Sequence, residues 1–162
     1  LNKMNGNFIK HLLSRITSYV DGLVGKDTTY ITYHQPKGKP YEIEHIWANK
    51  FEEHRDEFEQ ENDFSYWRNS IGALILLPEG TNQSFSSDRY EDKVEHYLKE
   101  NTYAQTLNSN YYQKNPNFLN NETIQELGFK PHSQFKKADI EDRKQLIRNL
   151  CEKIWSINDF NA

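Results

Sequence analysis

The chain has 162 residues, a length that fits one domain with its own core. Its apolar runs are too short to cross a membrane, and its single cysteine, Cys151, excludes an internal disulfide, so we expect a cytoplasmic protein. The formal net charge of -4 neither indicates nor excludes DNA as a partner.

The charge is unevenly distributed along the chain. Between Glu42 and Asp63 there are nine acidic and two basic residues, a local charge of -7, so the remainder carries +3. A divalent-cation site needs carboxylates, and a solvated acidic helix is the alternative explanation for most of this stretch.

The first third of the chain predicts one helix and two strands. Apolar residues recur at helical spacing from Asn7 to Val24, and Gly25 follows as a stop signal. Residues 28–33 are β-branched and aromatic, which favours a short strand. After a loop rich in proline and glycine, the alternation from Tyr41 to Trp47 predicts a second strand with His45 near its end.

The middle of the chain predicts a polar helix, a buried strand and a second helix. Residues 51–60 are mostly polar and favour a helix, and Trp67 is expected to begin a turn. Residues 74–77 are wholly apolar, which is typical of a short buried strand. Asp88 and Glu91 fit a capping box for a helix over about 89–100.

Two further helices are expected towards the C-terminus. Residues 101–121 give no clear pattern, but Asn121 is a cap for a short helix through Leu127, which Gly128 ends. Asp139 is expected to cap a final amphipathic helix. The whole chain, 1–162, is predicted to be one mostly helical α+β domain with a small antiparallel hairpin at its centre. Because it opens on Leu1 without a signal peptide, we expect a C-terminal piece of a longer protein.

A histidine, an acid and an amide follow the predicted strands in an order that suits phosphodiester hydrolysis. His45 lies at a strand end beside Glu44, Asn82 follows the buried strand, and Lys93 lies in the next helix. Histidine can deprotonate water near neutral pH, and Mg²⁺ accepts carboxylate and amide oxygens as ligands. Taken singly, however, a His–Glu neighbour pair is usually a surface feature, and Asn82 fits an ordinary turn.

This order resembles that of the HNH, or His-Me finger, endonucleases, and most closely the HNH-like domain of the GmrSD type. The resemblance lies in Glu44-His45, in Gly72 leading into the apolar strand, and in Asn82 and Lys93. It covers most of the chain from Glu42 onward, including Arg68-Asn69 before the glycine, Tyr90 before the lysine, and a closing helix with Arg143 and Trp155.

The resemblance implies a ββα-metal core over about 41–100, surrounded by helices. It also implies a metal-dependent DNA endonuclease that nicks or cuts both strands of modified or foreign DNA. In that family such a domain follows a ParB-like nucleotide-hydrolysing domain in restriction and anti-phage proteins.

The resemblance also implies a role for each site residue. His45 would be the general base, and Glu44 and Asn82 would bind Mg²⁺, with Mn²⁺ able to substitute. Asn69 would brace the loop that carries the base, and Lys93 would contact a phosphate or an internal carboxylate. Arg89 and Ser84 would contact DNA phosphates, and Glu42 matches a second acid of some HNH enzymes.

Three departures from the family pattern leave an alternative open. Glu44 stands where many HNH sites have aspartate, Ala48 stands where proline is common, and Ala73 stands where the middle asparagine is expected. The alternative is a degenerate HNH fold that serves as a DNA-binding or partner-docking module.

Overall fold

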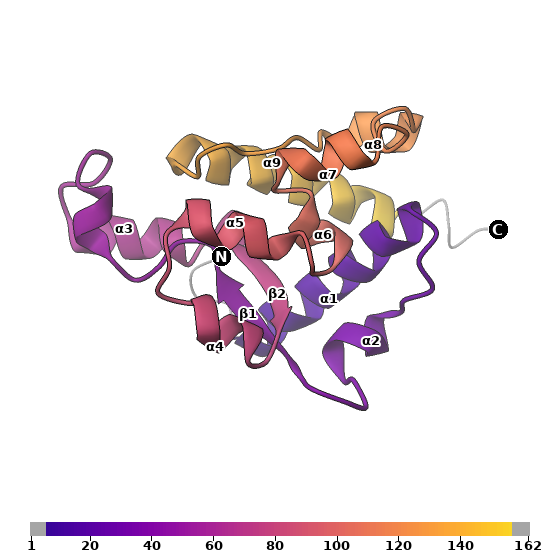
Figure 1. Ribbon diagram of the computed structural model, residues 1–162, viewed down its shortest axis with the longest axis horizontal. Coiled ribbons are helices and arrows are strands. Elements are labelled where there is room, and N and C mark those ends of the chain that lie inside the picture. The colour runs from indigo at the N-terminus through magenta and orange to yellow at the C-terminus, as the bar shows by residue number, and fades with distance from the viewer. Residues whose placement is uncertain (1–5, 157–162) are drawn as a thin grey trace.

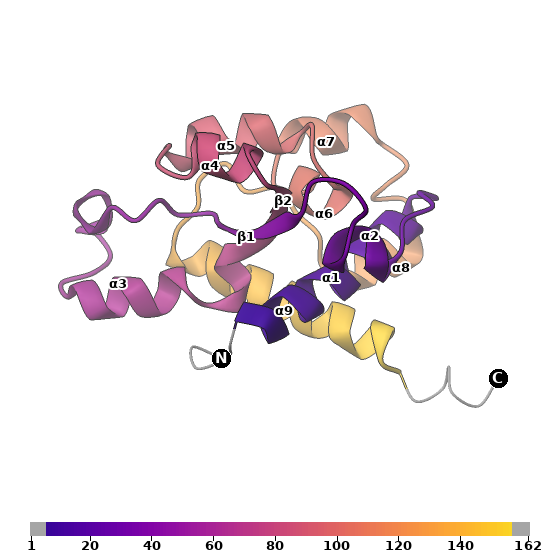
Figure 2. The ribbon, with the colours of Figure 1, turned by 90° about the horizontal axis from the view of Figure 1, so that it is seen from below.

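A two-stranded antiparallel sheet lies between two groups of helices. The computed structural model describes residues 6–156. Strand β1 (Tyr41–His45) pairs with β2 (Leu74–Pro78). Helices α4 (Thr81–Phe85) and α5 (Tyr90–Tyr97) cover one side of the sheet, and α1 (Gly6–Leu23) and α9 (Lys137–Ile154) lie on the other side (Figure 2).

Shorter helices complete the domain and extend it at both ends (Figure 1). They are α2 (Tyr30–His34), the 3-10 helix η1 (Phe51–His54), α3 (Glu61–Arg68), the 3-10 helix η2 (Ile71–Ala73), α6 (Thr102–Gln105), α7 (Ser109–Lys114) and α8 (Glu122–Leu127). Among residues 6–156, none of the helices combines the length and apolar character needed to cross a bilayer.

The sheet register places the end of β1 beside the start of β2. His45 pairs with Leu74 and Glu44 pairs with Ile75. One more backbone bond, from Ile46 N to the Ala73 oxygen at 2.9 Å, extends the pairing into η2. Leu74 to Leu77 are all buried, because helices cover both faces of β2.

Helix α9 packs directly on the turn that precedes β2. A Cβ atom added at Gly72 would lie 2.4 Å from the Ile140 carbonyl oxygen, so no larger residue fits there without displacing α9. Arg143 is buried in the same contact and donates from Nε to the Gly72 oxygen at 3.1 Å. The end of β1 is therefore tied to the C-terminal helix through η2.

Several predictions are confirmed. The first helix, the strands at 41–47 and 74–77, and the mostly helical α+β class are all present. Asn121 caps α8 by accepting from Ile124 N at 3.2 Å, and Gly128 ends that helix with a φ of 84°. The ββα-metal arrangement stays a prediction. The strands do not form a tight hairpin, since η1, α3 and η2 connect them.

The strand predicted at 28–33 is wrong, because residues 30–34 form helix α2. The Thr32 hydroxyl accepts from Thr29 N at 3.0 Å, which fixes the first turn of this helix. Tyr33 is buried and donates its hydroxyl to the buried carboxylate of Asp21. A contact with α1 therefore overrides the β-branched composition of this segment.

The helix predicted at 51–60 is also wrong in position. Only η1 forms there, and α3 begins at Glu61, so Trp67 lies inside a helix and does not begin a turn. Two cap positions shift as well. Arg89 and not Asp88 is the N-cap residue of α5, and Asp139 is the third residue of α9, where its carboxylate accepts from Lys136 N at 2.8 Å.

Candidate active site

The backbone around His45 is anchored at three successive residues. The His45 carbonyl oxygen accepts from Lys93 Nζ at 2.9 Å, and Ile46 N donates to the Ala73 oxygen at 2.9 Å. The Trp47 oxygen then accepts from Arg68 Nε at 3.1 Å. The two side-chain donors come from α5 and α3, so tertiary contacts and not the strand alone fix the position of His45.

The His45 ring is held by Asn69, the C-cap residue of α3. The distance from His45 Nε2 to Asn69 Oδ1 is 2.9 Å. The Asn69 amide group donates from Nδ2 to the Ser65 oxygen at 2.7 Å, which turns Oδ1 towards the imidazole. An amide oxygen accepts only, so Nε2 carries the proton, and a neutral ring keeps its lone pair on Nδ1. Among the described residues no hydrogen bond to Nδ1 forms.

The surroundings of His45 keep its ring uncharged. Burial, together with the positive charges of Arg68 and Lys93, lowers the pKa of His45 to about 4, and the Asn69 hydrogen bond opposes this shift. The imidazole is thus neutral at physiological pH, with Nδ1 able to accept a proton. The structure therefore brings His45 and Asn69 together, and their parts in a reaction stay predictions.

The side chain of Glu44 lies away from that of His45, an arrangement that disfavours the predicted role of Glu44 as a metal ligand. Successive side chains of a strand point to opposite faces, and Glu44 is buried beneath α5 with 2% of its surface exposed. Its Oε1 lies 2.6 Å from Lys93 Nζ. The carboxylate is therefore occupied by an internal cation.

The same pair corrects the prediction that Lys93 contacts a DNA phosphate. The Lys93 side chain has no exposed surface, and its partner is the internal carboxylate that the sequence offered as the alternative. Burial lowers the pKa of Lys93 and raises the pKa of Glu44, and in each case the partner's opposite charge counteracts the shift.

Asn82 lies in α4, directly after β2, and α4 contacts both strands. Its side chain lies outside the described part of the structure, so its role as a metal ligand stays a prediction. Within residues 6–156, no group of three or more His, Cys, Asp and Glu side chains is arranged to hold a metal ion. With Glu44 bound to Lys93, the described residues do not fit a cation anchored by a carboxylate beside His45.

The two predicted surface contacts with DNA lie near the start of α5. The Arg89 side chain is 70% exposed, with its Nε 3.7 Å from Glu53 Oε1, and Ser84 is exposed and donates to the Gly80 oxygen at 2.8 Å. Arg89 also lines a hollow of about 380 Å³ whose lining includes Trp47, which follows His45 closely along the chain. Both side chains are accessible from solvent, and their contact with phosphate stays a prediction.

Sequence reasoning assigned no role to Arg68. Its half-buried guanidinium holds the Trp47 carbonyl, and its charge acts on both His45 and Glu44. The signal in the sequence was its position directly before Asn69. Arg68 thus brings a second cation to the site.

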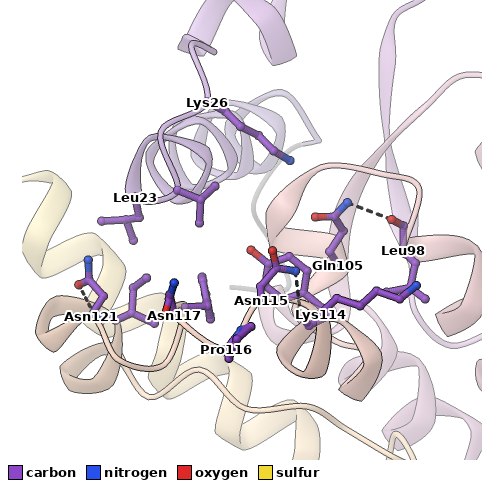
Figure 3. Close-up of a pocket in the computed structure, with 13 residues that line it drawn as sticks. Leu23, Lys26, Leu98, Gln105, Lys114, Asn115, Pro116, Asn117 and Asn121 are labelled. Carbon is purple, nitrogen blue, oxygen red and sulfur yellow. Dashed lines mark hydrogen bonds between the residues drawn. The ribbon is translucent and has the colours of Figure 1, made fainter.

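A larger hollow lies beside the C-terminal end of α1, between α7 and α8. Its volume is about 760 Å³ (Figure 3). Its lining includes Lys26, Lys114 and four amide side chains but no histidine, cysteine or carboxylate. Several of those amides already bond within the protein, such as Gln105 Nε2 to the Leu98 oxygen at 2.9 Å. We therefore assign no reaction to it.

The comparison with protein-family models identifies a family for the chain. The family model of the C-terminal domain of GmrSD restriction endonucleases matches residues 2–150. The chain belongs to this family. The match spans both strands, α3, α4 and α5, and hence every residue of the candidate site in this GmrSD C-terminal domain. Neither the curated proteins nor the solved structures contain a match.

Proposed function

We propose that this GmrSD C-terminal domain hydrolyses phosphodiester bonds in DNA and that His45 is the general base. The observation that carries the proposal is the state of the His45 ring. Asn69 fixes its Nε2 proton, and burial keeps it neutral, so Nδ1 can take the proton of an attacking water. The anchored backbone holds that nitrogen in place without a rearrangement during the reaction.

The charges around His45 suit an anionic substrate. Arg68 and Lys93 are cationic and Glu44 is anionic, which leaves a formal local charge of +1 (two minus one). We assign to Arg68 the task of offsetting the negative charge on the phosphoryl oxygens, because its guanidinium is only half-buried and Lys93 is wholly buried. Arg89 and Ser84 would hold flanking phosphates.

Dependence on Mg²⁺, with Mn²⁺ able to substitute, stays a prediction. A divalent cation offers phosphodiester hydrolysis a Lewis acid that also stabilises the leaving group. The described residues do not fit a cation bound by Glu44, so the proposed roles are those of His45 and Arg68. Asn82 is the candidate ligand that remains.

We further propose that the domain is the cutting unit of a restriction or anti-phage protein. DNA that is modified or foreign would be the substrate, and a nucleotide-hydrolysing N-terminal domain or subunit would be the partner. Membership in a restriction endonuclease family supports this proposal.

Supercoiled plasmid is the substrate that tests the reaction. The 162-residue protein should convert it to nicked or linear DNA in Mg²⁺ or Mn²⁺, and EDTA should stop the reaction. Cleavage that persists in EDTA would contradict the metal prediction and leave the role of His45 standing. A matched control is His11→Ala, since His11 is an exposed histidine of α1.

One observation favours the second candidate, a DNA-binding or docking module. Glu44, the acid that the family pattern places beside the base, is buried and paired. A module of this kind would bind duplex DNA or a partner without cutting at any divalent-cation concentration. Binding with no cleavage by wild type in either Mg²⁺ or Mn²⁺ would replace the nuclease proposal with this one.

A further inference from the structure

We infer that Glu44 and Lys93 form a positioning pair that fixes the backbone of His45, and that Glu44 is not a ligand of a catalytic metal. The role of His45 in this inference rests on the proposed function. The existence of the pair and its hold on residue 45 do not, and they can be measured without DNA or metal.

Lys93 joins the two neighbouring residues through one ammonium group. Its Nζ lies 2.6 Å from Glu44 Oε1 and 2.9 Å from the His45 carbonyl oxygen. An ammonium has three donors and no acceptor, so two of its donors are directed to β1. Lys93 thereby holds β1 at two successive residues, through the side-chain carboxylate of Glu44 and through the backbone carbonyl of His45.

Burial makes this pair hard to break for the benefit of a metal. The side chains of Lys93 and Glu44 are 0% and 3% exposed. If Glu44 turned outwards towards a cation near His45, Lys93 would stay buried without an anion, and a buried unpaired charge is strongly unfavourable. Glu44 would also have to reverse the alternation of β1, which the pairing of Glu44 with Ile75 and of His45 with Leu74 fixes.

Lys93 and Asn69 hold His45 from two different helices. Lys93 reaches β1 from α5, which covers the face opposite α1 (Figure 2). Asn69 holds the ring of His45 from α3, whereas Lys93 holds its carbonyl oxygen. Two separate helices therefore fix the base at two points, and loss of either should change the orientation of the ring.

The test compares Glu44→Gln, Lys93→Met and the double variant Glu44→Leu/Lys93→Met with wild type. Each single variant leaves one buried member of the pair without its partner, so the melting temperature in metal-free buffer should fall by roughly 10 °C. The double variant replaces the pair with apolar side chains, so it should recover most of that loss. It still lacks the donor to the His45 carbonyl.

The readout of positioning is the NMR signal of the His45 ring, assigned by comparison with His45→Ala. In the double variant this signal should shift from its wild-type position although the stability has recovered. Plasmid cleavage by the double variant should fall about tenfold or more. The matched control is Lys153→Met, which removes an exposed ion pair between α9 and Glu126 of α8 and should change neither the melting temperature nor the ring signal.

Two results would overturn the inference. The first is a Glu44→Gln protein that melts like wild type without metal but binds Mn²⁺ at least tenfold more weakly, because that pattern belongs to a ligand. The second is a double variant with an unchanged His45 signal. If wild type cuts no DNA, the melting and NMR results still decide on the pair, and only the proposed reaction fails.

Discussion

His45 and His132 both have hydrogen-bonded rings, and the partners of the two rings differ. His45 bonds to the neutral amide of Asn69, whereas His132 bonds through Nδ1 to the Asp139 carboxylate at 2.7 Å. A histidine–carboxylate pair is the more familiar arrangement in active sites. Here, however, the His132 side chain is 3% exposed, and its backbone oxygen accepts from Tyr90 OH at 2.7 Å.

The difference shows that the function of a histidine depends on what its second nitrogen and its surroundings allow. His132 and Asp139 connect the segment before α9 to α5 and to the first turn of α9, which is a structural task. His45 lies at a strand end, its Nδ1 accepts no hydrogen bond from the described residues, and two cations lie near it. The His132–Asp139 pair therefore stabilises the fold, whereas the His45–Asn69 pair belongs to the candidate site.

The largest expected effect separates the two histidines by activity. His45→Ala should reduce plasmid cleavage by roughly a hundred- to ten-thousand-fold, because the general base is lost, with little change in melting temperature. His132→Ala should instead lower the melting temperature by roughly 5 °C and leave the cleavage rate of the folded fraction near that of wild type. The reverse pattern would assign the reaction to His132.

A smaller effect should follow from the partners of the two rings. Asn69→Ala frees the His45 tautomer and should lower the cleavage rate about tenfold or more with a small change in stability. Asp139→Asn replaces the carboxylate near His132 with a neutral amide. It should therefore lower the melting temperature and leave the cleavage rate unchanged. An Asn69→Ala protein that cuts at the wild-type rate would remove Asn69 from the site.

The pH dependence of stability should also reflect His45. Its folded pKa of about 4 lies below the ordinary value near 6.5, so the unfolded chain takes up the proton first as the pH falls. This contribution to stability is therefore fully present above about pH 6.5 and is lost progressively towards about pH 4. When the pH falls from about 7 to about 5, the melting temperature of wild type should decrease more than that of His45→Ala. An equal loss in both proteins would mean that the ring titrates normally.

The smallest expected effect concerns DNA binding at the surface. Arg89→Ala should weaken binding of a short duplex uniformly across sequences and lower the slope of log affinity against log salt by about 1. Arg55, an exposed arginine of the acidic stretch that pairs with Glu52, provides a matched control. Equal effects of Arg89→Ala and Arg55→Ala would indicate that Arg89 makes no specific phosphate contact.

The sequence was informative where a segment's own periodicity decided its structure. Helix α1, both strands and the cap at Asn121 follow from residue spacing alone. Residues 28–33 have the composition of a strand, but Tyr33 donates a hydrogen bond to Asp21 of α1. The spacing of residues in the sequence does not predict that contact. Helix α3 was missed because its polar surface lacks a clear apolar period.

The candidate site shows the same division. His45 and Asn69 were predicted and do meet. For Glu44, the family pattern favoured a metal ligand. The observed structure instead follows the alternation of a strand, which directs Glu44 to the face opposite His45. The partner of Glu44 lies 49 residues away in α5, and only the packing of α5 on the sheet brings them together.

The close contact between Gly72 and α9 has a consequence for the smallest unit that can work. Ile140 and Arg143 of α9 touch the turn whose last residue, Ala73, bonds to Ile46 beside the base. A fragment trimmed to residues 41–100 would retain every predicted catalytic residue yet lose the support behind that turn. A shortened version of this domain that is meant to cleave DNA must therefore keep the last helix, α9.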